Sequence, residues 1–282
     1  MRTLLTCALL LLATACTHTP SSERASTARA GVSVLPNRIT IPGLERPRTV
    51  RLYLPPRYAQ GMRRYPVIYM HDAQNLFDEA TAPFGEWGVD ETLDAIAAQQ
   101  GFEAIVVGVD HGNAHRTTEL NPWDHPRFGR GEGVAYAAFV AEVLRPWVDE
   151  HYRTLTGPEH TAIIGSSLGA LLSDYAIHRY AAVFGRAAML SPAYWVADPA
   201  VYAYAEQHPL PAGARVWFSV GSHEGDSTVP DAERMHQVMA AQRPEPGAVS
   251  YHLVPGGKHH EPAWRAELPS ALAFLFAPAI AP

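Results

Sequence analysis

Residues 165–169, with the sequence Gly-Ser-Ser-Leu-Gly, constrain the fold more than any other stretch of this chain. Residues 161–164 before them are apolar and partly β-branched, which predicts a buried strand. Residues 168–180 after them place apolar side chains at helical spacing. A strand, a Gly-x-Ser-x-Gly turn and a helix are together typical of a nucleophile elbow. Ser167 is therefore the candidate nucleophile, and a plain small-residue turn is the alternative.

Composition narrows the classes of protein to which the chain can belong. Its 282 residues suffice for a single α/β domain, since such domains run to about 200–250 residues. A net charge of −6 and a pI near 6.1, without a basic stripe, argue against nucleic acid as a partner. No histidine or cysteine pair has metal-ligand spacing on a clear helix or hairpin, so no metal is predicted. The neighbouring residues Asp110, His111 and His115 are a weak candidate set of ligands.

The first residues predict export. Arg2 precedes a short apolar run, too short to span a bilayer, and together they indicate a signal peptide over residues 1–15. The small residues at its end are followed by Cys16, an arrangement that resembles a bacterial lipoprotein signal whose cysteine is lipidated. Ala13 stands where such signals usually carry leucine, so ordinary cleavage at the same bond is the alternative.

A tether and one domain are predicted after the signal. Residues 16–31 are rich in Ser, Thr, Ala and Arg without apolar periodicity, which is typical of a flexible tether. Residues 32–282 then form the folded domain. Cys7 lies inside the signal, so the mature chain would hold Cys16 alone and no internal disulfide.

Strands and helices are predicted to alternate through the domain. Strands are expected at residues 32–41, 49–54, 67–71, 104–109, 161–164, 187–190, 216–220 and 249–254. Helices are expected at residues 89–100, 134–152, 168–180, around 235–239 and at 264–274, with Pro146 kinking or dividing the second. Such alternation predicts an α/β fold with a mostly parallel eight-stranded sheet and helices on both faces. With the nucleophile after the fifth strand, it matches the α/β-hydrolase fold.

That fold orders its triad as serine, then acid, then histidine, which directs the search downstream of Ser167. Glu224 follows a predicted strand and is the first choice for the acid, with Asp226 as the second choice. His259 and His260 follow the last predicted strand, and either could take the proton of the serine. The residues alone do not separate these two histidines.

An oxyanion hole needs two N–H groups. One belongs to Leu168, the residue after the nucleophile, and the other to the loop at residues 71–75, which follows the third predicted strand. Ordinary loop chemistry, with Asp72 in an Asx-turn, is the alternative for that polar loop.

Several motifs together resemble the putative-esterase (esterase D-like) family of α/β-hydrolases, which includes siderophore and feruloyl esterases and mycolyl transferases. They are residues 65–77, Arg116 with residues 119–122, and residues 152–155, 165–169, 190–195 and 259–264. The resemblance spans residues 36–276, and the motifs are specific for the family only in combination.

The resemblance implies roles for individual residues. In the family the catalytic histidine lies five residues before a tryptophan, so Trp264 selects His259 over His260. The acid falls at Glu224, although some similar siderophore esterases lack a proper acid. The second oxyanion N–H falls at Gln74. Ala73 stands where many relatives have glycine, and its methyl group is expected to narrow the approach to the site.

Three functions compete at this point. The first is an exported serine hydrolase that cleaves carboxylic esters through an acyl-enzyme on Ser167 and requires no metal or cofactor. The second is an acyltransferase that passes the same acyl group to a sugar or alcohol. The third is a surface binding protein that keeps only the fold. A small-molecule ester is the expected partner of either enzyme, and nothing in the sequence indicates an oligomeric state.

Aromatic residues in two segments could stack on a phenolic acyl group or a sugar face. They are Trp123, Phe128, Tyr194, Trp195, Tyr202 and Tyr204. Packing of these rings within a cap over the sheet is an equally good interpretation.

We expect the mature protein to begin at Cys16 and to partition with detergent. Cys16→Ala should release it as a soluble protein, because no acyl chain would then hold it at a membrane. Mass spectrometry of the N-terminus and detergent partitioning measure both outcomes. An intact Met1 on cytosolic protein would contradict the prediction.

Overall fold

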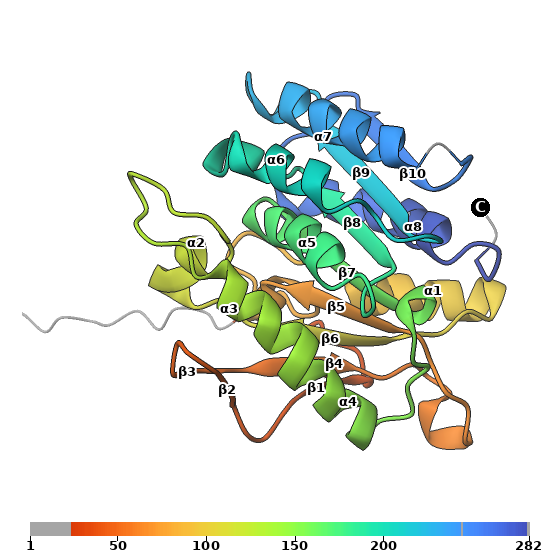
Figure 1. Ribbon diagram of the computed structural model, residues 1–282. Coiled ribbons are helices and arrows are strands. Elements are labelled where there is room, and N and C mark those ends of the chain that lie inside the picture. Colours follow the sequence, from red (N-terminus) through yellow and green to blue (C-terminus); the bar gives the residue numbers. More distant parts are fainter. Residues whose placement is uncertain (1–23, 244, 281–282) are drawn as a thin grey trace, which may run out of the picture.

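The computed structural model describes residues 24–243 and 245–280 (Figure 1). The predicted signal at residues 1–15 and Cys16 lie outside the described residues. Within the described ranges, eight strands form one sheet in the order β1-β4-β6-β5-β7-β8-β9-β10. They are β1 (Val32–Val34), β4 (Val50–Tyr53), β5 (Val67–His71), β6 (Ile105–Val109), β7 (Thr161–Ser166), β8 (Arg186–Leu190), β9 (Arg215–Gly221) and β10 (Val249–Val254).

The sheet is mostly parallel, as the sequence predicts. Strands β6, β5, β7, β8, β9 and β10 pair in parallel, whereas β1 and β4 pair antiparallel at one edge. Both faces of β5 to β9 are covered, so these strands are buried and mostly apolar, whereas the edge strand β10 is partly exposed. In β7, for example, Ile163 packs into the core on one face and Ile164 into the core on the other.

Helices cover the two faces unequally (Figure 1). One face packs against α1 (Val89–Gln100) and α8 (Glu261–Leu275). The other packs against α3 (Gly133–Ala138), α4 (Arg145–His151), α5 (Leu168–Arg179), α6 (Ala200–Gln207) and α7 (Thr228–Gln242). No helix of the described residues is long and apolar enough to cross a membrane.

Residues 32–41 do not form the single strand that the sequence predicts. The strand is broken near Pro36, and β2 (Ile39–Ile41) leaves the main sheet to pair with β3 (Arg46–Arg48) as a separate hairpin. The sequence gives little sign of β3, because Pro47 lacks an N–H for a strand ladder.

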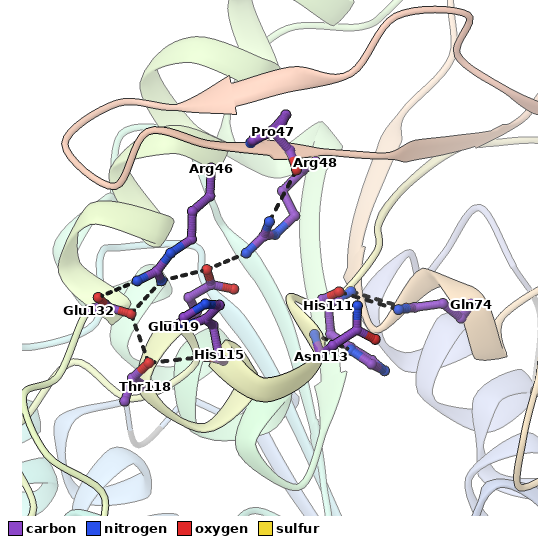
Figure 2. Close-up of polar contacts among 10 residues, drawn as sticks. All are labelled: Arg46, Pro47, Arg48, Gln74, His111, Asn113, His115, Thr118, Glu119 and Glu132. Atoms are coloured by element: carbon purple, nitrogen blue, oxygen red, sulfur yellow. Dashed lines mark hydrogen bonds and ion pairs between the residues drawn. The ribbon is translucent and has the colours of Figure 1, made fainter.

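Ion pairs around the buried carboxylate of Glu119 hold the hairpin against the domain (Figure 2). Arg46 donates to Glu132 at 2.6 and 3.0 Å and to Glu119 at 2.8 Å, and Arg48 also donates to Glu119. Glu119 is 1% exposed and belongs to the short helix α2 (Arg116–Glu119), so the ion pairs also fix the loop after β6.

Pro146 divides the long helix as predicted. The helical path from α3 to α4 passes through a π-helical turn at Phe139–Leu144, and Pro146 lies in the first turn of α4. A proline has no N–H and collides with the preceding turn of a regular helix, and a wider turn relieves both problems.

The last residues of the predicted tether contact the domain. Ser26 donates to Asp78 at 2.8 Å, and the backbone N–H of Arg29 donates to Asp90, also at 2.8 Å. The hydroxyl of Thr27 accepts from the N–H of Glu79 and donates to Glu86, both at 2.9 Å. We call residues 26–29 the N-terminal strap.

Thr27→Val should lower the free energy of unfolding by about 1–3 kcal/mol, because it leaves the N–H of Glu79 and the carboxylate of Glu86 without their partner. Thr27→Ser keeps the hydroxyl and should stay close to wild type. Denaturant titration of both variants measures the difference. Equal stability of the two variants would show that the strap contacts contribute nothing.

Candidate active site

The turn after β7 holds Ser167 in a conformation that L-residues rarely adopt. Its φ of 56° and ψ of −122° place it outside the usual regions, at the N-terminus of α5. Such strain persists only where the surroundings impose it, and it gathers at functional sites. Here the backbone packing imposes it, because a Cβ on Gly165 would lie 2.4 Å from the carbonyl carbon of Gly169.

The strand order explains why a site forms at this edge of the sheet. The chain passes from β5 to β6 on one side and then to β7 on the other side of β5. Open parallel sheets bind ligands at the carboxyl ends of strands where the order reverses in this way. A cleft of about 530 Å³ lies there. Its lining residues are His71, Asp72, Asn75, Pro83, Phe84, Trp87, His111, Arg116, Ser166, Ser167, His259, His260, Glu261 and Trp264.

The candidate acid and the first histidine are in contact. Nδ1 of His259 lies 2.9 Å from Oε2 of Glu224, and the side chain of Glu224 is only 1% exposed. The loop that carries His259 comes very close to the end of β9. A Cβ on Gly221 would lie 2.3 Å from the carbonyl of Gly257. Glycine at both positions therefore lets the acid and the histidine meet.

Three donors satisfy the buried carboxylate of Glu224. Besides His259, the hydroxyl of Ser191 and the N–H of Gly221 each donate to Oε1 at 2.6 Å. Ser191 in turn accepts from Nε1 of Trp264 at 2.8 Å. Burial raises the pKa of Glu224, but these hydrogen bonds outweigh burial and hold the pKa below its ordinary value. Glu224 is therefore an anion at neutral pH.

The alternative residues occupy other positions. His260 is the N-cap of α8, where its Nδ1 accepts from the N–H of Ala263. Asp226 is exposed and, within the part of the chain that the structure describes, accepts no hydrogen bond. Ser166, the last residue of β7, lines the same cleft as Ser167.

The two candidate oxyanion donors follow neighbouring strands, Gln74 after β5 and Leu168 after β7. Leu168 is the first residue of α5, where a backbone N–H has no partner within the helix. Gln74 lies in the turn after β5. Its side chain accepts from the N–H of His111 at 3.0 Å and donates to the carbonyl of the same residue at 3.4 Å (Figure 2). This pairing ties the turn to the loop after β6.

The expectation that Ala73 narrows the approach to the site is wrong. Its side chain is fully buried in the core beneath the loop. There it faces Gly108 of β6, where an added Cβ would lie only 2.7 Å from the methyl group. Ala73 therefore affects the packing of the loop on the sheet and leaves the cleft unchanged.

The aromatic residues singled out in the sequence do not line the cleft. Tyr194 and Tyr202 are buried, and Trp123 packs edge-on against Tyr175 and Tyr204. These rings therefore pack within the layer of helices over the sheet, whereas Trp195 packs edge-on against Phe128 and is 48% exposed. The aromatic side chains that line the cleft are Phe84, Trp87 and Trp264. Phe84 is 75% exposed, an arrangement that local periodicity could not indicate.

Sequence reasoning also missed the charged groups of the cleft. Arg116 donates to Asp72 through two nitrogens, at 2.7 and 2.9 Å. The carboxylate of Glu261 accepts from Asn75 at 3.1 Å. Burial lowers the pKa of His71 to about 4, so its imidazole is neutral at pH 7. Each of these residues falls within a family motif of the sequence, but the motifs did not indicate these pairings in the cleft.

Metal ligands are not gathered anywhere in the described residues, where no group of three His, Cys, Asp or Glu side chains could hold an ion. Asp110, from the weak candidate set, is instead paired with Arg51 at 2.7 Å. The cleft combines a strained serine, an imidazole bonded to a carboxylate and N–H groups at a helix N-terminus. Such a set suits acyl transfer.

A family comparison gives this arrangement its context. Residues 41–275 match the family described as Putative esterase. The chain belongs to the esterase family. This esterase is 26% identical over 244 residues to the uncharacterized protein YbbA of Bacillus subtilis, covering 81% of this chain and 92% of that one.

Solved structures share the fold of the esterase. The BES protein from Bacillus cereus superposes with a TM-score of 0.71 at 17% identity, covering 90% of this chain and 97% of that chain. An IroE-like serine hydrolase from Shewanella oneidensis gives 0.70 at 17% identity, covering 87% and 80%. The α/β fold with a mostly parallel eight-stranded sheet is thus shared with serine hydrolases.

Glu224→Gln should lower kcat/KM by about 10²–10⁴, because an amide cannot hold the imidazole in the tautomer that leaves Nε2 free. Asp226→Asn should stay within about twofold of wild type, since Asp226 makes no contact with His259. Kinetics on a chromogenic ester, with circular dichroism to check folding, measure both variants. A folded Asp226→Asn enzyme with the larger loss would reverse the assignment of the acid.

Proposed function

We propose that this esterase is a serine carboxylesterase in which Ser167, His259 and Glu224 form the catalytic triad. The observation that carries the proposal is the 2.9 Å contact between His259 and the buried Glu224, at a cleft that also contains the strained Ser167. The N–H groups of Leu168 and Gln74 are proposed to bind the oxyanion.

The contact with Glu224 decides how His259 would act. Nδ1 donates its proton to the carboxylate, so Nε2 carries the lone pair and can accept the hydroxyl proton of Ser167. Oγ of Ser167 then adds to the ester carbonyl carbon, and the carbonyl oxygen takes the negative charge. Glu224 stabilises the imidazolium without itself taking the proton.

The second half of the reaction reverses the proton transfer. The imidazolium returns its proton to the departing alkoxide, which leaves as an alcohol and yields the acyl-enzyme. Water then attacks the acyl carbonyl while His259 takes its proton. Collapse breaks the bond to Oγ, His259 returns the proton to Oγ, and the carboxylic acid leaves. An acyltransferase would differ only in that a sugar or alcohol replaces water in this step.

Structural relatives suggest small-molecule esters as substrates. Among them are a siderophore hydrolase, EstA from Aspergillus nidulans, and an enterobactin esterase of Shigella flexneri solved with enterobactin, both with a TM-score near 0.7. A ferulic acid esterase is also similar. We propose that the substrate is a small-molecule ester, acted on outside the cytoplasm by a protein anchored through Cys16.

Ser167→Ala should lower turnover by about 10³–10⁶, because it removes the group that forms the covalent intermediate. His259→Ala should be about as severe, and the double variant little worse, since the two residues act as a unit. A panel of feruloyl, acetyl-sugar and siderophore esters provides the assay. Adding a sugar acceptor to the same assay distinguishes transfer from hydrolysis by the product formed.

Ser166→Ala and His260→Ala are the matched controls. Ser166 lines the cleft beside the nucleophile and His260 follows the base, yet both variants should keep substantial activity. A fluorophosphonate probe should label wild type and both controls but not Ser167→Ala. Labelling that survives in Ser167→Ala, or that is lost in a folded Ser166→Ala variant, would falsify the assignment. A folded wild type inert on the whole panel would favour a binding protein.

A further inference from the structure

The charged groups of the cleft do not balance. Its ionisable lining consists of Arg116, Asp72 and Glu261, together with the histidines His71, His111, His259 and His260. Arg116 and Asp72 form a two-pronged ion pair, at 2.7 and 2.9 Å, which leaves little net charge. Glu261 has no cationic nitrogen within 4 Å among the residues that the structure describes, so no direct ion pair neutralises it. Arg116, His259 and His260 act on it only at longer range.

The position of Glu261 keeps its carboxylate in the cleft. The residue is 6% exposed and begins α8, two positions after His259. One oxygen, Oε1, accepts from the amide of Asn75 at 3.1 Å. Oε2 accepts no hydrogen bond within residues 24–243 and 245–280, and Glu261 lines the same cleft as Ser167.

A purely structural role does not account for this carboxylate. An acidic residue in the first turn of a helix is favourable by about 0.3–1 kcal/mol, and Glu261 has that position. The N-cap of the same helix is already satisfied by His260, however. Burial and the nearby charge of Asp72 raise the pKa of Glu261, so its position in the cleft costs free energy that a surface position would not.

We propose that Glu261 is a specificity-determining residue that selects esters with a hydrogen-bond donor, a hydroxyl or ammonium group, next to the scissile bond and disfavours esters with a carboxylate there. This inference rests on the proposed esterase function of the same cleft. A donor on the substrate would satisfy Oε2, whereas an anion would meet the negative charge of Glu261. Arg116 offsets that charge only at longer range, because its guanidinium is hydrogen-bonded to Asp72.

We expect the charge of the substrate to have the largest effect on which esters this site selects. Two like charges about 4 Å apart repel far more in a partly buried site than in water. A hydroxyl gains a charge-assisted hydrogen bond, which is roughly twice as strong as a neutral one. The preferred substrate class is therefore a polyhydroxylated or cationic ester.

Four p-nitrophenyl esters of equal length test the inference, with a methyl, hydroxyl, ammonium or carboxylate group at the same acyl position. Wild-type kcat/KM should be highest for the hydroxyl and ammonium esters and at least about tenfold lower for the carboxylate ester than for the methyl ester. Glu261→Gln, which keeps an oxygen for Asn75, should remove most of that tenfold penalty. The ratio of the carboxylate to the methyl ester within each enzyme is the readout, so a general change in activity does not affect the comparison.

Glu150→Gln removes the same charge from an exposed position on α4 and should leave the substrate ranking unchanged. An unchanged ranking in a folded Glu261→Gln enzyme, or equal wild-type rates for the methyl and carboxylate esters, would overturn the inference while the esterase function stands. A wild-type enzyme that cleaves none of the four esters would instead count against the proposed function. If Glu261→Gln does not fold, competitive inhibition of wild type by matched hydroxyl and carboxylate product analogues supplies the same comparison.

Discussion

The buried carboxylate of Glu224 is the group on which the geometry of the site depends. A carboxylate that is 1% exposed is tolerated only when hydrogen bonds replace the lost water. Its donors come from three separate parts of the chain: the end of β8 through Ser191, the end of β9 through Gly221, and the loop that carries His259. Satisfying one buried charge therefore holds three segments at the same edge of the sheet.

The need to hydrogen-bond the carboxylate of Glu224 also determines where α8 packs. Trp264 donates to Ser191 at 2.8 Å and packs edge-on against the ring of His259, with the centroids 5.1 Å apart. One indole thus supports two of the three donors to Glu224, Ser191 and His259. The spacing between His259 and Trp264, which the sequence offered only as a family resemblance, has this physical basis. His260 could not take the same place, because its side chain caps α8.

Local sequence pattern was sufficient for the parts of the fold that depend on local physics. The apolar runs of β5 to β10, the elbow and the division of a helix at Pro146 all follow from burial, helical spacing and proline chemistry. The pattern failed where long-range polar contacts decide the structure. Ion pairs to Glu119 hold β3 in spite of Pro47, and neither these pairs nor the role of Ser191 leaves a periodic signal. The sequence pattern also could not predict that Glu261 places a charge in the cleft, since that depends on which residues the fold places around Glu261.

The N-terminal strap, residues 26–29, connects the beginning of the described chain to the cleft that contains Ser167, more than a hundred residues further along the sequence. Its partners Asp78 and Glu86 flank Pro83 and Phe84, and these two residues form a wall of the cleft. The strap is therefore an outer brace for that wall, joined to it by contacts 51 to 61 residues apart in sequence. A recombinant form that starts after Arg29, or an affinity tag fused close to Ser26, would loosen the brace. Kinetic constants measured on such a form would describe a cleft in which Pro83 and Phe84 are held less firmly than in the native chain.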